Sequence, residues 1–393
     1  MVDEDASYRS GAAAAQAARG EYTRRRRVEV NQYRITFMQF ALLIHGTQVA
    51  TSVLSLPRQL AEIASTDGWI SIILAWVINL FFSVLMIIIM RQYPEDTLPE
   101  LLERLFGGVI SKLVLALVGL HLAFMFWSTF VATMLYIKSW FLVMTPVVYI
   151  LLLFSIPAYV TARKHITHIA RYCEVVFYLT IWMAPVLLLP LREGYLIYFL
   201  PILKEGWGPV IQAMPTTTTA FLGFEIVFFV YPFLTRKDLA IQGVVLGNAL
   251  TMLVYTFSTI VCFGFFSPDE IIQYNQPILN LLKVIEFRFL ERFDIIFLAL
   301  YLLVISTSLV PFLYGAAISG ANLFGTKNHG PYALLICACT LLIATWIKPS
   351  WQESLRYKEW ASNSGMFISY LLPLLLYLSI KVYQKLTPKE ASQ

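Results

Sequence analysis

The chain has 393 residues, of which 58% are hydrophobic and only 13% are charged. A typical soluble domain carries about 25% charged residues, because its surface has to interact with water. This composition excludes a soluble enzyme and predicts an all-α polytopic membrane protein. The 29 Lys and Arg against 24 Asp and Glu give a net charge of +5, so the distribution of the basic residues bears on orientation.

Long stretches without Asp, Glu, Lys or Arg recur along the chain. A stretch of roughly 18 or more apolar residues is long enough for a helix to cross the hydrocarbon core. Only Lys138 divides the third stretch from the fourth, and the fifth is short. The stretches predict ten transmembrane helices, at 35–57, 69–90, 113–137, 139–162, 175–191, 206–235 (with one exception, Glu225), 239–268, 295–326, 330–347 and 361–380.

The first 34 residues are polar, alanine-rich and basic, with arginine at each position from Arg24 to Arg27. We expect residues 1–34 to form a disordered basic cytoplasmic tail. Residues 35–386 then form the ten-span membrane domain. If the spans alternate from a cytoplasmic tail, most Lys and Arg residues lie on its side, which predicts cytoplasmic N- and C-termini.

Ten spans divide into two sets of five, at about 35–191 and 206–380. Because five is odd, the two halves enter the membrane in opposite directions, as in an inverted repeat. In such folds, helices interrupted at matching positions in the two halves indicate the binding site. The most polar stretches lie in spans 1 and 6, so we predict broken helices there, with ligand-binding residues Thr47, Gln48, Val49, Ala50, Ser52, Phe221, Leu222, Gly223, Phe224 and Glu225.

Irregular backbone at membrane depth persists only where protein buries it or where it lines a cavity. The free N–H groups at a helix break bind a carboxylate, and the free carbonyls bind an amine or a cation. The alternative is that the glycine and threonine residues simply allow the helices to pack closely.

Glu225 is the one formally charged residue inside a predicted span. A carboxylate at the bilayer centre costs roughly 2.5–3.5 kcal/mol on insertion scales, so such residues are candidates for function. Three roles remain open for Glu225: it binds a ligand ammonium, carries a proton, or makes a structural hydrogen bond to span 1.

Hydroxyl groups in span 8 form a second candidate site. Ser306 and Thr307 are predicted to face the carbonyls of span 1 and to coordinate a monovalent cation there. The alternative is that these hydroxyls bond back to their own helix. His45 and His121 also lie within predicted spans. We interpret both as hydrogen-bonded packing residues, and a role as proton relays is the alternative.

No known enzyme motif is present, so no catalytic residue and no cofactor is expected. Cys337 and Cys339 are two residues apart and point in different directions on a helix, which does not suit a metal site. The aromatic residues near span ends are typical of a membrane-interface belt, and no nucleic-acid partner is expected.

Three runs resemble the B subunits of spore germinant receptors (GerAB-type spore germination proteins), which belong to the amino acid–polyamine–organocation transporter superfamily. ITFMQFALLIHGTQVATSVLSLPR resembles their first span, AFLGFEIVFFVYPFL their sixth, and NLLKVIEFRFLERFDIIFLALYLLV the stretch before and within span 8. The resemblance covers about residues 33–386. The family usually has a Gly-x-Gly in span 1, where this chain has Ala50 and Ser52. The loss of glycine removes access to positive φ, so we expect the backbone and the ligand to differ from the family pattern there.

The resemblance implies a leucine-transporter-like fold of five plus five inverted spans. It also implies a subunit in the spore inner membrane that recognises a nutrient, often an amino acid or sugar, and triggers germination. Its implied partners are a receptor A subunit and a C lipoprotein. A proton- or sodium-coupled amino acid permease is the alternative, since the two functions share the fold.

Overall fold

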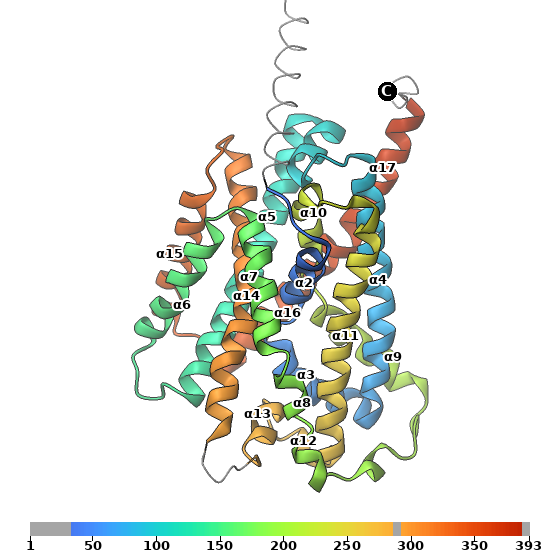
Figure 1. The fold of residues 1–393 in the computed structure, drawn as a ribbon, viewed down its shortest axis with the longest axis vertical. Coiled ribbons are helices and arrows are strands. Elements are labelled where there is room, and N and C mark those ends of the chain that lie inside the picture. Colours follow the sequence, from blue (N-terminus) through green and yellow to red (C-terminus); the bar gives the residue numbers. More distant parts are fainter. Residues whose placement is uncertain (1–32, 286–291, 387–393) are drawn as a thin grey trace, which may run out of the picture.

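The computed structural model describes residues 33–285 and 292–386, and within these ranges the chain is a bundle of helices with no named strand (Figure 1). Most of the predicted tail therefore lies outside the described residues. The α-helices are α2 Phe37–Gln48, α3 Ser52–Ala64, α4 Gly68–Gln92, α5 Leu98–Trp140, α6 Val147–Ala162, α7 Ile166–Thr180, α8 Met183–Val186, α9 Trp207–Ala220, α10 Val227–Val230, α11 Ala240–Phe265, α12 Pro268–Ile271, α13 Pro277–Leu282, α14 Phe293–Leu323, α15 Gly330–Ile347, α16 Trp351–Gly365 and α17 Leu372–Leu386.

Short helical turns connect several of these elements. The 3₁₀ turns are η1 Ser65–Asp67, η2 Pro190–Glu193, η3 Leu196–Phe199, η4 Phe224–Ile226, η5 Tyr231–Phe233 and η6 Lys237–Leu239. Between α16 and α17 lies a π-helical turn, η7 Met366–Leu371. π-turns inside longer helices often mark functional sites.

Seven helical segments of the described chain are long and apolar enough to cross a membrane. An eighth results if α9 and the helical segment after it, bent by 42° at a short break, count as one span. The protein is therefore a multi-pass membrane protein. The outer helices support this, because α6 and α15 expose apolar side chains such as Leu153 at 59% and Leu342 at 71%.

The first predicted broken span consists of α2 and α3, with residues 49–51 between them. The α2 helix begins at a capping box, in which Thr36 and Gln39 hydrogen-bond each other's backbone, and it packs against α7, α11 and α14. It is buried by protein rather than exposed to lipid. This burial puts the polar stretch of span 1 at the centre of the molecule.

The beginning of α2 is tied to the end of the second predicted broken span. The Ile35 N–H donates to the Phe233 carbonyl at 2.9 Å, and the Thr235 N–H donates back to the Ile35 carbonyl at 3.0 Å. In Figure 1 this link lies toward the end of the bundle where α17 finishes, away from α12 and α13. The two interrupted segments are thus joined by backbone hydrogen bonds at this end, and α3 packs against α9 beyond the breaks.

Candidate functional site

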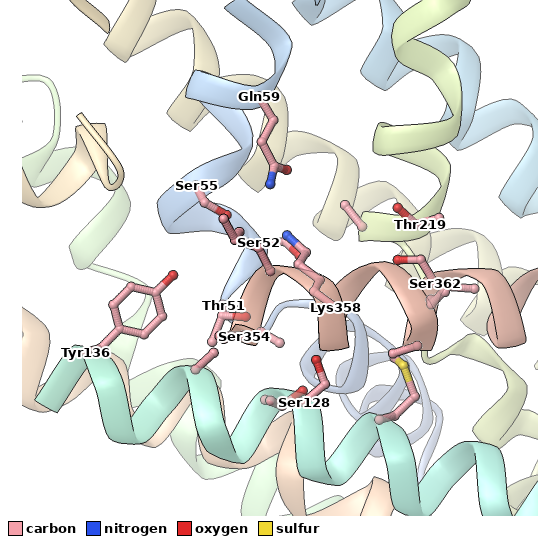
Figure 2. Close-up of a pocket in the computed structure, with 18 of the residues that line it drawn as sticks. Thr51, Ser52, Ser55, Gln59, Ser128, Tyr136, Thr219, Ser354, Lys358 and Ser362 are labelled. Carbon is pink, nitrogen blue, oxygen red and sulfur yellow. The ribbon is translucent and has the colours of Figure 1, made fainter. Parts of the chain in front are cut away.

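A cavity of about 170 Å³ opens where the two interrupted segments come together. This is below the roughly 300–1,000 Å³ of sites for drug-sized ligands, so it suits a smaller molecule. Most of the lining residues labelled in Figure 2 carry hydroxyl groups, and they come mainly from α3, α5, α9 and α16. The polar residues at its wall include Thr47, Gln48, Thr51, Ser52, Ser55, Arg58, Gln59, Glu62, Ser128, Thr129, Tyr136, Thr219, Asn275, Gln276, Ser354, Lys358 and Ser362.

Hydroxyl groups from other helices stabilise the break between α2 and α3. The Ser308 hydroxyl lies 2.7 Å from the Gly46 carbonyl oxygen and 3.1 Å from that of Val49. The Tyr301 hydroxyl donates to the Ala50 carbonyl at 2.7 Å. The carbonyls that a continuous helix would pair internally are therefore paired with α14. The break needs no glycine, because Val49 has a φ of −81° and the N-cap Thr51 a φ of −72°.

The break after α9 depends on a glycine. Gly223 has a φ of +120°, which L side chains rarely adopt, and a Cβ placed there would lie 2.8 Å from the Thr47 carbonyl oxygen. The Gly223 N–H donates to the Glu225 carboxylate at 2.9 Å. Glycine thus provides both the backbone angle and the close approach of the second segment to the first.

Side chains from α2 and α11 bridge the two breaks. Gln48 donates from Nε2 to the Phe221 carbonyl at 2.9 Å and to Asn248 Oδ1 at 2.9 Å. The Tyr255 hydroxyl lies 2.9 Å from the Gln48 carbonyl oxygen and 2.8 Å from that of Ala220. Because a hydroxyl has one hydrogen, Tyr255 donates to one of these carbonyls at a time. The two interrupted segments therefore form one hydrogen-bonded unit.

Glu225 lies behind the cavity in a buried polar cluster, with a relative exposure of 2%. One carboxylate oxygen, Oε2, accepts from the Gly223 N–H and from the Ser369 hydroxyl at 3.0 Å. The other, Oε1, lies 3.5 Å from His121 Nε2, and His121 Nδ1 lies 2.9 Å from the Ser364 hydroxyl. Oε1 and Nε2 are neighbours, but neither has a hydrogen-bond partner among the described residues. The π-turn η7 supplies Ser369.

The predicted ligand-binding residues separate into two groups. Thr47, Gln48, Ala50, Ser52 and Leu222 line the cavity. The other predicted residues lie behind this wall: Val49, Phe221, Gly223, Phe224 and Glu225. Phe221 packs edge-on against the Tyr255 ring, with the ring centroids 5.3 Å apart. The second group therefore shapes the site from behind.

The span 8 hydroxyls are arranged differently from the sequence-based expectation. Thr307 faces span 1, with its hydroxyl 3.1 Å from the Gly46 carbonyl oxygen, but Ser306 contacts the Tyr172 hydroxyl of α7 at 2.6 Å. Ser308 takes the place expected of Ser306. The reason is helical geometry, since neighbouring residues lie about 100° apart around the axis and only two of the three face α2.

Two features of the site were missed from sequence. His121 was interpreted as a hydrogen-bonded packing residue, which its contact with Ser364 supports, but its position beside Glu225 was not predicted. Lys358 was placed outside the tenth span, because that span was defined by the absence of charged residues, yet α16 carries Lys358 along the cavity wall. A helical register drawn through 351–365 would have revealed Ser354, Lys358 and Ser362 at a spacing of four residues.

The fold is that of leucine-transporter-like transporters. A Na⁺-coupled sialic acid symporter in a substrate-bound outward-open state superposes with a TM-score of 0.61, at 12% identity, over 86% of this chain and 79% of the symporter. A nucleobase–cation symport family transporter in a closed conformation gives a TM-score of 0.51, also at 12% identity, over 80% of this chain and 72% of the transporter.

Sequence relatives are found among the spore germination proteins of Bacillus subtilis strain 168. Spore germination protein A2 is 24% identical over 356 residues, which cover 88% of this chain and 95% of the relative. Protein B2 is 26% identical, covering 81% and 88%, and protein YndE is 26% identical, covering 88% and 96%. The model of the spore permease family, described as spore germination protein, matches residues 34–352. The chain belongs to this family of spore germination proteins.

Proposed function

We propose that this chain is the membrane subunit of a nutrient germinant receptor and that it binds a small nutrient, an amino acid, in the cavity at the two breaks. The observation that supports this most strongly is the position of the cavity. In a member of a germination family, a small cavity lined by both polar and apolar side chains lies against the segments whose backbone is not continuously helical.

A ligand in this cavity would contact several helices at once. The α3 and α16 helices form facing walls, and Leu222 and Thr219 adjoin the break after α9 (Figure 2). A ligand that contacts all of them favours the state in which they are close together. We propose that an A subunit and a C lipoprotein in the spore inner membrane respond to this change.

We also propose that the chain crosses the membrane ten times. The ten spans would be α2–α3, α4, α5, α6, α7–α8, α9–α10, α11, α14, α15 and α16–α17, with broken helices 1 and 6 and repeats at about 35–191 and 206–380. Both termini would be cytoplasmic. The direct test is cysteine labelling with a membrane-impermeant reagent, which should modify a cysteine at Asn275 but not one at Arg91 in intact cells.

The ligand site is tested by filling it. Leu222→Trp places an indole in the cavity, and Leu342→Trp places the same group on the outer face of α15. We expect the first variant to abolish amino acid-induced thermal stabilisation of the purified protein and germination of spores that carry it. The control should preserve both. Equal responses of the two variants would refute a ligand site here.

A proton-coupled amino acid permease is the second candidate, and the Glu225–His121 pair favours it. Coupled transport needs a buried group that exchanges a proton as the protein changes state, and these side chains are adjacent and enclosed. Uptake into proteoliposomes driven by a pH gradient, and lost in Glu225→Gln, would establish transport. Sodium-driven uptake lost in Thr307→Val would instead assign a cation to Thr307 and Ser308.

A further inference from the structure

Lys358 has an unusual environment for an ammonium group. It lies in the middle of α16, is partly buried, and points from that helix toward Ser52 and Gln59 of α3 (Figure 2). Among the described residues it has neither a hydrogen bond nor an ion pair. A partly buried ammonium with no anion or acceptor beside it costs free energy, so the site favours an anion next to Lys358.

The carboxylates nearest to Lys358 in the chain or in the cavity wall already have other partners or point elsewhere. Glu62 pairs with Arg58 at 2.8 Å, and Glu353 accepts from the N–H and hydroxyl of Ser350 at 2.8 Å each. Glu359 adjoins Lys358 in the helix but is exposed and does not line the cavity.

The rest of the wall agrees with a negatively charged ligand. Ser52 and Ser55 of α3 and Ser354 and Ser362 of α16 present hydroxyl donors around the lysine, and the cavity contains one basic group more than it has acidic groups. A ligand that carries only a positive charge would meet the ammonium without a counter-ion. An anionic group would gain a charge-assisted hydrogen bond together with donors from both walls.

We propose that Lys358 is a specificity-determining residue that pairs with a carboxylate of the ligand, so that the cavity selects carboxylate-bearing nutrients over amides and amines. This inference rests on the proposed function and specifies the chemistry of that site. The carboxylate would connect α16 to α3, which are separate in the chain and face each other across the cavity.

The experiment uses the purified full-length chain and isothermal titration with the twenty L-amino acids, followed by the primary amide of each one that binds. An amide keeps the side chain and the ammonium but lacks the negative charge. We expect the amide to bind at least tenfold more weakly to the wild type. Lys358→Met should lower acid binding to the level of the amide, and Lys358→Arg should keep the preference.

Arg356→Met provides the matched control, because Arg356 lies on the same helix as Lys358 but is exposed and does not line the cavity. It should keep the preference for the acid. If Lys358→Met does not fold, Lys358→Gln replaces it. Equal binding of acid and amide, or an unchanged preference without Lys358, would overturn the inference and leave the proposed function standing. If no amino acid binds the wild type, the proposed function fails, and this inference fails with it.

Discussion

The two breaks in the helices look alike in outline but are stabilised in different ways. The break after α9 is stabilised by residues next to it in the chain. Gly223 provides the backbone angle, and the Glu225 carboxylate, two residues away, accepts a hydrogen bond from the Gly223 N–H. The break between α2 and α3 has ordinary φ angles, and hydroxyls from Ser308 and Tyr301 of α14 pair its carbonyls. One break is thus encoded locally, and the other depends on the assembled bundle.

The largest effect is expected at the locally encoded break. Gly223→Ala adds the strain of a positive φ and a Cβ 2.8 Å from the Thr47 carbonyl oxygen, for a total loss of about 2–5 kcal/mol. Unfolding by SDS in mixed micelles measures this. Gly206→Ala is the matched control, because Gly206 has a φ of +75° with no atom within 4 Å of the added Cβ. It should lose only about 1–2 kcal/mol. Equal losses would mean that contact with Thr47 is unimportant.

The next effect concerns the side chain that serves both breaks. Tyr255→Phe removes the hydroxyl shared by the Gln48 and Ala220 carbonyls, and we expect a loss of about 1–3 kcal/mol because buried carbonyls are left unpaired. Tyr301→Phe removes a hydroxyl from one carbonyl, that of Ala50, and should cost less. The same unfolding assay measures both losses of stability. A larger loss in Tyr301→Phe than in Tyr255→Phe would show that Tyr255 does not bridge the two breaks.

A smaller effect is expected at the break that depends on the bundle. Ser308→Ala removes one donor near the Gly46 and Val49 carbonyls, while Thr307 still lies 3.1 Å from the Gly46 oxygen. Interhelical hydrogen bonds in membranes contribute about 0.6 kcal/mol on average and up to about 1.7. The double variant with Thr307→Val should lose more than the sum of the single variants. Strict additivity would show that the two hydroxyls do not substitute for each other.

The smallest change in stability is expected for Glu225→Gln. The amide oxygen still accepts from Gly223 and Ser369, so we expect a loss within about 1 kcal/mol. Glu225→Ala leaves the Gly223 N–H and the Ser369 hydroxyl without this acceptor and should cost about 2–6 kcal/mol, at about 1–3 kcal/mol for each donor. If function also survives in Gln but not in Ala, Glu225 acts as a hydrogen-bonding group. Loss of function in both, with Gln stable, would indicate that the site needs a charge or an exchangeable proton.

The same comparison explains what the sequence revealed and what it did not. Gly223 and Glu225 are conspicuous within one apolar run, so the second break and its acid were predicted from a few adjacent letters. The donors to the first break are Ser308, Tyr301 and Tyr255, which lie more than 200 residues away in the chain. Nothing in their local sequence tells which face of α14 or α11 meets α2, and for this reason Ser306 was chosen where Ser308 lies.

Lys358 shows a different limit. The predicted spans were defined as stretches without charged residues, with Glu225 as the one exception. Lys358 therefore fell outside the tenth predicted span, although its helix lines the cavity. Serines at intervals of four around Lys358 give α16 a polar face toward the cavity, and only the packing of α16 against α5 shows that this face does not meet water freely.

The short backbone link between Ile35 and Phe233 has a mechanical consequence. Its backbone hydrogen bonds hold the residue before α2 against the end of the second interrupted segment. A rotation of α2 would therefore also move that segment. The link holds α2 and the segment that ends at Phe233 together on one side of the breaks, and the packing of α3 against α9 holds the chain together on the other side. A force that displaces α2 from the rest of the bundle would therefore act on both breaks at once.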